Sequence, residues 1–197
     1  TGMKASINYV TGKDSLANKK VCVQGVGNVG SKVVDYLIEE GAEIFVSDIN
    51  QNNLNKISSK KVNIIDIKDI HNTHYDIFSP CALGGIINSK TVKKLDCKII
   101  AGAANNQLED DDFIPNELKR KNILYVPDFL INAGGIISVY HEQINKIDSR
   151  KVMQMTESIY DKALDVFKYA NDNNTTTHSA AIKLAKDRIQ RNKKNSN

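Results

Sequence analysis

The chain has 197 residues, 41% of them hydrophobic, and a formal net charge of +4. This length suits one large domain, and the hydrophobic fraction is high enough for a buried core. No apolar run approaches the ~18 residues of a membrane span, and the N-terminus lacks the apolar core of a signal peptide. We therefore expect a folded, soluble, cytoplasmic protein that does not bind membranes.

The cysteines and the C-terminal charge do not point to special chemistry. Cys22, Cys81 and Cys97 lack CxxC spacing, which favours reduced, mostly buried thiols over a disulfide framework or a zinc site. The segment near the C-terminus is rich in basic residues, and Asp187 is its one acidic residue. The basic residues are Lys183, Lys186, Arg188, Arg191, Lys193 and Lys194. A solvated helix face explains this run more simply than nucleic-acid binding, so no nucleic-acid partner is expected.

The chain begins inside a predicted helix, residues 1–11, which Gly12 ends. Met3, Ile7 and Val10 share its apolar face. A start of this kind implies a domain boundary or a further segment upstream.

The next motif has the spacing of a dinucleotide-binding turn. Residues 21–23 are predicted to form a buried strand, and Gly25-x-Gly27-x-x-Gly30 leads from it into a helix. Gly25 permits a tight turn, Gly27 leaves room for a pyrophosphate, and Gly30 lets the helix lie close to the strand. The inner face of this helix is predicted to comprise Val29, Val33, Val34, Leu37 and Ile38. Glycines at this spacing also occur in ordinary turns, so the motif alone is weak.

The segment after the glycines strengthens the nucleotide hypothesis. Beyond Gly41, a predicted helix C-cap, residues 44–46 form a second strand that ends at Asp48, 18 residues past Gly30. An acid at about 20 residues hydrogen-bonds the ribose 2′-OH of NAD. Its carboxylate would repel the 2′-phosphate of NADP, and residues 49–59 contain no arginine, so NAD is the expected cofactor.

The remaining strands and helices alternate along the chain. A helix is predicted at residues 50–57, and strands at residues 62–65, 75–78, 98–100 and 124–126. Polar or glycine-rich loops come after three of these strands, at residues 79–85, 101–107 and 127–128. Alternation of this kind predicts an α/β fold, a doubly wound parallel Rossmann-type sheet with helices on both faces, whose ligands bind at the carboxyl ends of the strands.

Two groups of candidate metal ligands have simpler interpretations. Asp110, Asp111 and Asp112 stand just before a predicted helix with Pro115 in its first turn, where acids favour the helix N-terminus. His71 and His74 lie in a polar loop with no third ligand nearby, so we interpret them as solvated side chains. We therefore expect no bound metal.

Three helices are predicted in the C-terminal part. One begins near Asn132 and includes a pair of glycines, and one long amphipathic helix covers residues 150–170. The last covers residues 180–189. The predicted inward residues of these last two helices are Val152, Met155, Ile159, Ala163, Val166, Ala170, Ala181, Leu184, Ala185 and Ile189. These helices would pack on the sheet as an extension of a single NAD-binding domain, residues 1–197.

Six blocks in this order resemble the NAD-binding domain of the leucine, phenylalanine and valine dehydrogenases, relatives of glutamate dehydrogenase, and leucine dehydrogenase most closely. The blocks are residues 2–5 (GMKA), 23–29 (VQGVGNV), 47–50 (SDIN), 80–84 (PCALG), 101–108 (AGAANNQL) and 132–135 (NAGG). The resemblance covers nearly the whole chain. It implies oxidative deamination of an L-amino acid to its 2-oxo acid and ammonia.

The resemblance also implies roles for individual residues. Cys81, Ala82 and Asn105 would border the nicotinamide and its ribose, and Asn132 would face both nicotinamide and substrate. The complete predicted cofactor site is Gly25, Val26, Gly27, Asn28, Val29, Gly30, Asp48, Ile49, Cys81, Ala82, Asn105 and Asn132. Ile136 and Val139 would join Asn132 in the substrate pocket and favour an aliphatic, branched-chain side chain, unless they are simply core residues.

One departure from the family is large. Two glycine-flanked lysines and an aspartate carry the family's substrate binding and proton transfer, in an N-terminal domain that would precede Thr1, and nothing here matches them. We therefore assign no catalytic residue, and expect the chain alone to be inactive. In the full enzyme we expect the amino acid substrate to bind with that missing domain, and a homo-oligomer. The alternative is a non-catalytic NAD-binding sensor or assembly module.

Overall fold

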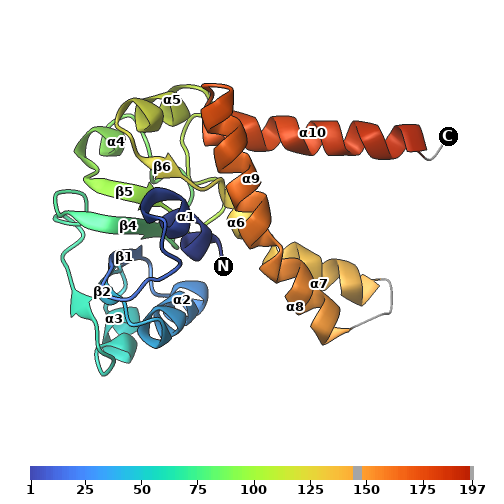
Figure 1. Cartoon of the computed structure of the whole chain (residues 1–197). Coiled ribbons are helices and arrows are strands. Elements are labelled where there is room, and N and C mark those ends of the chain that lie inside the picture. The colour runs from blue at the N-terminus through green and yellow to red at the C-terminus, as the bar shows by residue number, and fades with distance from the viewer. Residues whose placement is uncertain (144–147, 196–197) are drawn as a thin grey trace.

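The computed structural model, which describes residues 1–143 and 148–195, is built on a six-stranded sheet in the order β3-β2-β1-β4-β5-β6 (Figure 1). Every strand pair is parallel. The strands are β1 (Lys20–Gln24), β2 (Glu43–Ser47), β3 (Asn63–Ile64), β4 (Tyr75–Pro80), β5 (Cys97–Ile100) and β6 (Leu124–Tyr125). The predicted doubly wound fold is confirmed, and the strand order reverses between β1 and β4, where such sheets bind their ligands.

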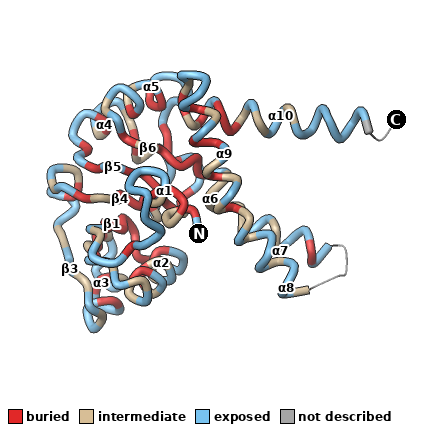
Figure 2. The backbone as a smooth tube through the Cα atoms, viewed as in Figure 1, coloured by how far each residue is buried: buried red, intermediate tan, exposed pale blue. Residues whose placement is uncertain are grey.

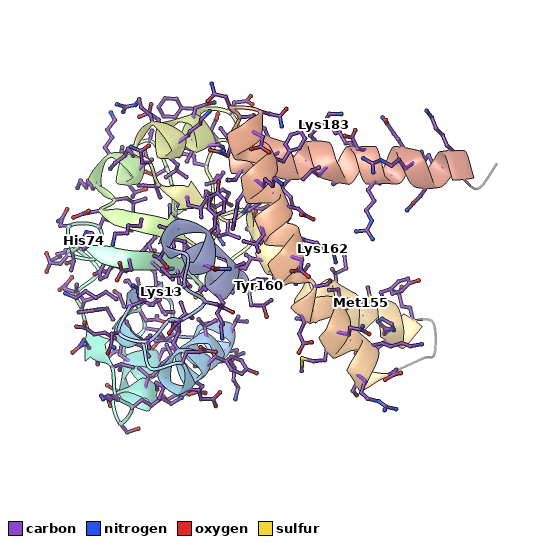
Figure 3. The ribbon with its side chains drawn as sticks, viewed as in Figure 1. Lys13, His74, Met155, Tyr160, Lys162 and Lys183 are labelled. Carbon is purple, nitrogen blue, oxygen red and sulfur yellow. The ribbon has the colours of Figure 1, made fainter. Side chains whose placement is uncertain are left out.

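Alternation along the strands divides the core between the two faces of the sheet. Val21 and Val23 enter one core, and Cys22 between them enters the other. The first core is covered by α1 (Gly2–Thr11), α2 (Asn28–Glu39), α3 (Gln51–Ile57) and α9 (Ile159–Asp172). Helices α1 and α9 lie side by side, and the Asn8 amide donates to the Tyr160 hydroxyl at 2.7 Å (Figure 3).

The second core is covered by α4 (Thr91–Lys94) and α5 (Phe113–Arg120). Cys22 and Cys97 are buried there, and burial raises the pKa of each thiol to about 12, so neither is a thiolate at neutral pH. The predicted helix N-terminus after residues 110–112 is confirmed, because the Asp110 carboxylate accepts the backbone N–H groups of Asp112 and Phe113.

Helix α6 (Asp128–Ile131) stays on the body, where Leu130 and Ile131 pack against the first core. The helices that leave the body are α7 (Gly134–Gln143), α8 (Ser149–Glu157) and, beyond its buried first turns, α10 (Thr177–Asn195). Helix α7 packs against α8, and this pair and the outer half of α10 project from the same side of the sheet body (Figure 1). Figure 2 shows that these projecting parts are mostly exposed, whereas the central strands β1, β4 and β5 are mostly buried.

The single helix predicted over residues 150–170 is wrong, because the chain turns at Ser158 between α8 and α9. The Ser158 hydroxyl donates to the Met155 carbonyl at 2.6 Å, the kind of local bond with which serine competes with helical bonding. The two halves also differ in burial. No residue of α8 is buried, and Met155 is 39% exposed, whereas the predicted inward residues of α9 are buried.

Other residues predicted to face the core are exposed, because they lie on parts of helices that do not pack on the sheet. Val10 and Val29 are 43% and 58% exposed, at the end of α1 and in the first turn of α2. On α10, Ala181 is buried, but Ala185 and Ile189 are exposed because the helix has left the body by that point.

The loop histidines differ from each other, so the prediction that both are solvated is wrong for one of them. His74 is exposed and its Nδ1 lies 2.9 Å from the Asp96 carboxylate. His71 packs its ring against Phe78, and burial lowers its pKa. Within the described residues, histidine, cysteine and acidic side chains do not gather in a group of three that could hold a metal. None of the described helices combines the length and apolarity needed to cross a membrane.

Candidate cofactor-binding site

The glycine loop, residues 25–30, is packed tightly at both ends. Gly25 has φ +91°, and a Cβ placed on it would lie 2.7 Å from the Cβ of Ala82. A Cβ on Gly30 would lie 1.9 Å from the carbonyl oxygen of Gly25. The N–H of Gly25 donates to the Ser47 carbonyl at 2.7 Å, which fixes the loop against the end of β2. Both positions therefore require glycine, as the sequence predicts.

Gly27 differs, because a Cβ placed on it would meet no heavy atom within 4 Å. This residue is the N-cap of α2, and no side chain caps the helix there. The first-turn N–H groups of Asn28, Val29 and Gly30 have no intrahelical acceptors, and the helix dipole adds partial positive charge. An open backbone at an uncapped helix N-terminus is suited to a phosphate.

The Asp48 carboxylate is held by three donors beside this loop. Its Oδ2 accepts the N–H of Val26 at 2.8 Å and the side-chain amide of Asn53 at 3.0 Å, and its Oδ1 accepts the N–H of Asn50 at 2.8 Å. Burial by itself raises the pKa of Asp48, but these hydrogen bonds outweigh it, so the pKa is below its usual value. Ile49, the next residue, is 83% exposed and offers an apolar surface beside the ionised carboxylate.

The loops after β4 and β5 lie against each other and against the glycine loop. The N–H of Cys81 donates to the Gln24 carbonyl at 2.8 Å, and that of Ala104 donates to the Pro80 carbonyl at 3.0 Å. A Cβ on Gly102 would lie 2.2 Å from the same Pro80 oxygen. The structure thus brings the predicted residues Cys81 and Ala82 to the glycine loop.

Asn105 and Asn132, which are far apart in the sequence, meet at this edge. The Asn132 amide donates to the Asn105 side-chain carbonyl at 2.5 Å. The fully buried Gln107 holds the Asn105 loop from within, because its amide donates to the carbonyls of Gly102 and Ala104 at 2.9 Å.

Asp128 connects the Asn105 loop to α6. Its Oδ2 accepts the N–H of Gln107 at 3.3 Å, and its backbone carbonyl accepts the N–H of Asn132 at 3.0 Å. Sequence reasoning named Asp128 only as a polar residue after a strand and gave Gln107 no separate role. Their position in the segments that follow β5 and β6 was the available signal.

Comparison with known proteins decides the family. The sequence profile described as Glutamate/Leucine/Phenylalanine/Valine dehydrogenase matches residues 46–196. A phenylalanine dehydrogenase of Bacillus thermotolerans is 42% identical over 98% of this chain and 52% of its own length. The chain belongs to the glutamate/leucine/phenylalanine/valine dehydrogenase family.

Other members of the family are about equally similar. An L-tryptophan dehydrogenase of Nostoc punctiforme (strain ATCC 29133 / PCC 73102) is 42% identical over 98% of this chain and 55% of its length. A leucine dehydrogenase of Thermoactinomyces intermedius is 40% identical over 96% of this chain and 51% of its own length. These identities do not single out leucine dehydrogenase. The chain spans about half the length of the curated relatives it matches.

Solved structures agree with this fold. The crystal structure of L-tryptophan dehydrogenase from Nostoc punctiforme has a TM-score of 0.93 and 41% identity, covering 96% of this chain and 58% of that one. The hetero-hexameric glutamate dehydrogenase from Thermus thermophilus has a TM-score of 0.73 at 18% identity, covering 95% of this chain and 51% of that one, a likeness of fold alone.

Two of the three predicted substrate residues, Ile136 and Val139, lie on α7, and the third, Asn132, is the C-cap of α6. Ile136 is 72% exposed and Val139 is 49% exposed, so neither is a core residue of this chain. Their role in a substrate pocket stays a prediction.

Proposed function

We propose that this chain binds NAD and is the cofactor-binding part of an NAD-dependent L-amino acid dehydrogenase. One arrangement carries the proposal: the open backbone at Gly27, before an uncapped helix, lies beside the ionised carboxylate of Asp48 at the end of the next strand. The first part suits a pyrophosphate and the second suits a ribose hydroxyl. A carboxylate at this point would repel a third phosphate, which favours NAD over NADP.

In this proposal the chain's own residues bind and orient the cofactor. When bound, NAD supplies the acceptor for the hydride that leaves the α-carbon of the amino acid. The glycine loop and Asp48 hold the adenosine side, and the Asn105–Asn132 pair, tied to buried Gln107 and Asp128, borders the nicotinamide side. A rigid support of this kind keeps the ring in one place relative to the substrate.

We assign proton transfer, and the part of substrate binding that the family's two lysines perform, to a further domain of the complete enzyme. The relatives are about twice as long as the region they share with this chain, which leaves room for such a domain. We also propose that the complete enzyme is a homo-oligomer.

For the substrate we propose an aliphatic, branched-chain amino acid. Ile136 and Val139 are exposed, apolar and three residues apart on α7, so they lie on one helix face. Two branched side chains would form a compact pocket wall suited to a valine- or leucine-sized group.

The test uses the chain by itself. Calorimetric titration with NAD should show saturable binding, and assays with leucine, valine and phenylalanine at alkaline pH should give no NADH. Hydride transfer needs the substrate held about 3–3.5 Å from the nicotinamide and a base to take a proton, and in this proposal the chain alone supplies neither a complete substrate site nor a base. A folded sample that does not bind NAD refutes the cofactor site, and NADH production refutes the assignment of catalysis to another domain.

A further inference from the structure

Asn53, on the first turn of α3, is absent from the predicted cofactor site, yet it contacts that site's acid. Its amide donates to Asp48 Oδ2 at 3.0 Å. We propose that Asn53 is a positioning residue for NAD, which fixes the Asp48 carboxylate so that one oxygen is presented to the ribose. This inference rests on the proposed function.

The Asp48 carboxylate has little acceptor capacity to spare. The two oxygens of an ionised aspartate offer about four lone-pair sites. On Oδ2, the N–H of Val26 and the amide of Asn53 fill both sites, and on Oδ1 the N–H of Asn50 fills one. The remaining site lies on Oδ1. A ribose hydroxyl that approaches Asp48 therefore finds one acceptor, in a direction set by the other three bonds.

The donors differ in what holds them. Val26 and Asn50 donate through backbone N–H groups, fixed by the glycine loop and by the turn into α3. Asn53, in contrast, donates through its side chain. Because its amide and the N–H of Val26 both donate to Asp48 Oδ2, this one oxygen connects α3 to the glycine loop. Without the amide, Oδ2 keeps one bond, and the carboxylate gains freedom to rotate about its Cβ–Cγ bond.

Helix α3 should form without the Asn53 side chain, which argues against a purely structural role for this residue. The N-terminus of this helix is capped by Asn50, whose side chain accepts the N–H of Asn52 at 3.0 Å. Leucine has a higher helix propensity than asparagine, so Asn53→Leu should leave α3 formed. Leucine is also close to asparagine in size, which limits the entry of a water that could replace the lost donor.

The experiment compares the whole chain with Asn53→Leu and with Asn52→Leu as the matched control. Asn52 is the preceding residue on α3 and is exposed. The pKa of Asp48 is measured without cofactor from the pH dependence of its ¹³C side-chain carboxyl shift. NAD affinity is measured by calorimetry. In Asn53→Leu we expect a raised pKa for Asp48, because a donor to the ionised form is lost, and about fivefold weaker NAD binding, or about 1 kcal/mol. The control should match the parent in both.

The outcomes separate the two proposals. A pKa of Asp48 unchanged by Asn53→Leu would show that the amide does not hold the carboxylate, and would overturn this inference. A raised pKa with equal or tighter NAD binding would also overturn it, because the amide would then be neutral or would compete with the ribose. If the folded parent binds no NAD, the proposed function fails together with the cofactor role of Asn53. Asn53→Ala provides the same comparison if the leucine disturbs α3.

Discussion

Gly30→Ala and Gly27→Ala are expected to differ in effect, although the two residues share one loop: the first should destabilise the fold, and the second should abolish NAD binding and leave the fold intact. At Gly30 the new Cβ would lie 1.9 Å from the Gly25 carbonyl oxygen and 2.9 Å from its carbonyl carbon. Ordinary contact begins at 3.4 Å, so α2 and the glycine loop would have to separate by about 1.5 Å. Overpacking costs about 1–3 kcal/mol, and because backbone opposes backbone here we expect the upper end, about 3 kcal/mol of unfolding free energy.

At Gly27 the new methyl group meets no heavy atom within 4 Å, and φ is −68°, which alanine adopts without strain. Alanine is a poorer N-cap than glycine, and it also lowers the entropy of the unfolded chain, so the two effects offset each other to within about 1 kcal/mol. The fold should therefore survive. NAD binding should be lost, because the methyl group takes the space through which the pyrophosphate approaches the backbone.

Urea unfolding monitored by circular dichroism and calorimetric titration with NAD test both variants. Gly30→Ala should unfold at a clearly lower urea concentration than the parent, and Gly27→Ala close to the parent. A parent-like midpoint for Gly30→Ala would refute the argument from close packing. Parent-like NAD binding by Gly27→Ala would remove Gly27 from the phosphate site.

Three further predictions concern Asp48 and the substrate residues. Asp48→Ser should lower the ratio of NAD affinity to NADP affinity, and an unchanged ratio by calorimetry would contradict the role given to the carboxylate. Because the folded-state pKa of Asp48 is below its unfolded value of about 3.9, its stabilising effect is present above that pH and is lost as the pH falls through the folded pKa. Asp48→Asn should therefore flatten the dependence of unfolding free energy on pH at acidic pH, as measured by urea unfolding in a pH series. In the complete enzyme, Ile136→Ala should improve the use of larger amino acids at the expense of valine, and an unchanged order of kcat/KM would exclude Ile136 from the pocket.

Local patterns were sufficient to predict the strand–glycine loop–helix unit and the acid after the next strand. Gly25 and Gly30 have the tight packing expected of them, because the tasks of a glycine turn depend on residues close in sequence. The Asn105–Asn132 contact was expected only as a shared edge, since the spacing of strands places loops together without giving side-chain bonds.

Other features depend on tertiary structure that periodicity does not encode. The helical pattern of apolar residues continues through Ser158, where a local hydroxyl bond and a change in burial divide α8 from α9. On α10 the pattern marks Ile189 as apolar without saying what covers it, and it is 56% exposed. Asn53 was missed although it is only five residues from Asp48, because helical periodicity describes which face of α3 is apolar and not which polar side chain turns back to the preceding strand end.

In the proposed function, NAD binds along the carboxyl edge of the sheet, from the glycine loop and Asp48 to the Asn105–Asn132 pair. Amide chemical shifts of the isotope-labelled chain, recorded during an NAD titration, would locate the bound cofactor residue by residue. We predict saturable changes that are largest in residues 25–30 and 48–50 and in the side-chain amides of Asn105 and Asn132. Changes confined to the groove of about 910 Å³ between α9 and α10, or the absence of any saturable change in a folded sample, would contradict this location.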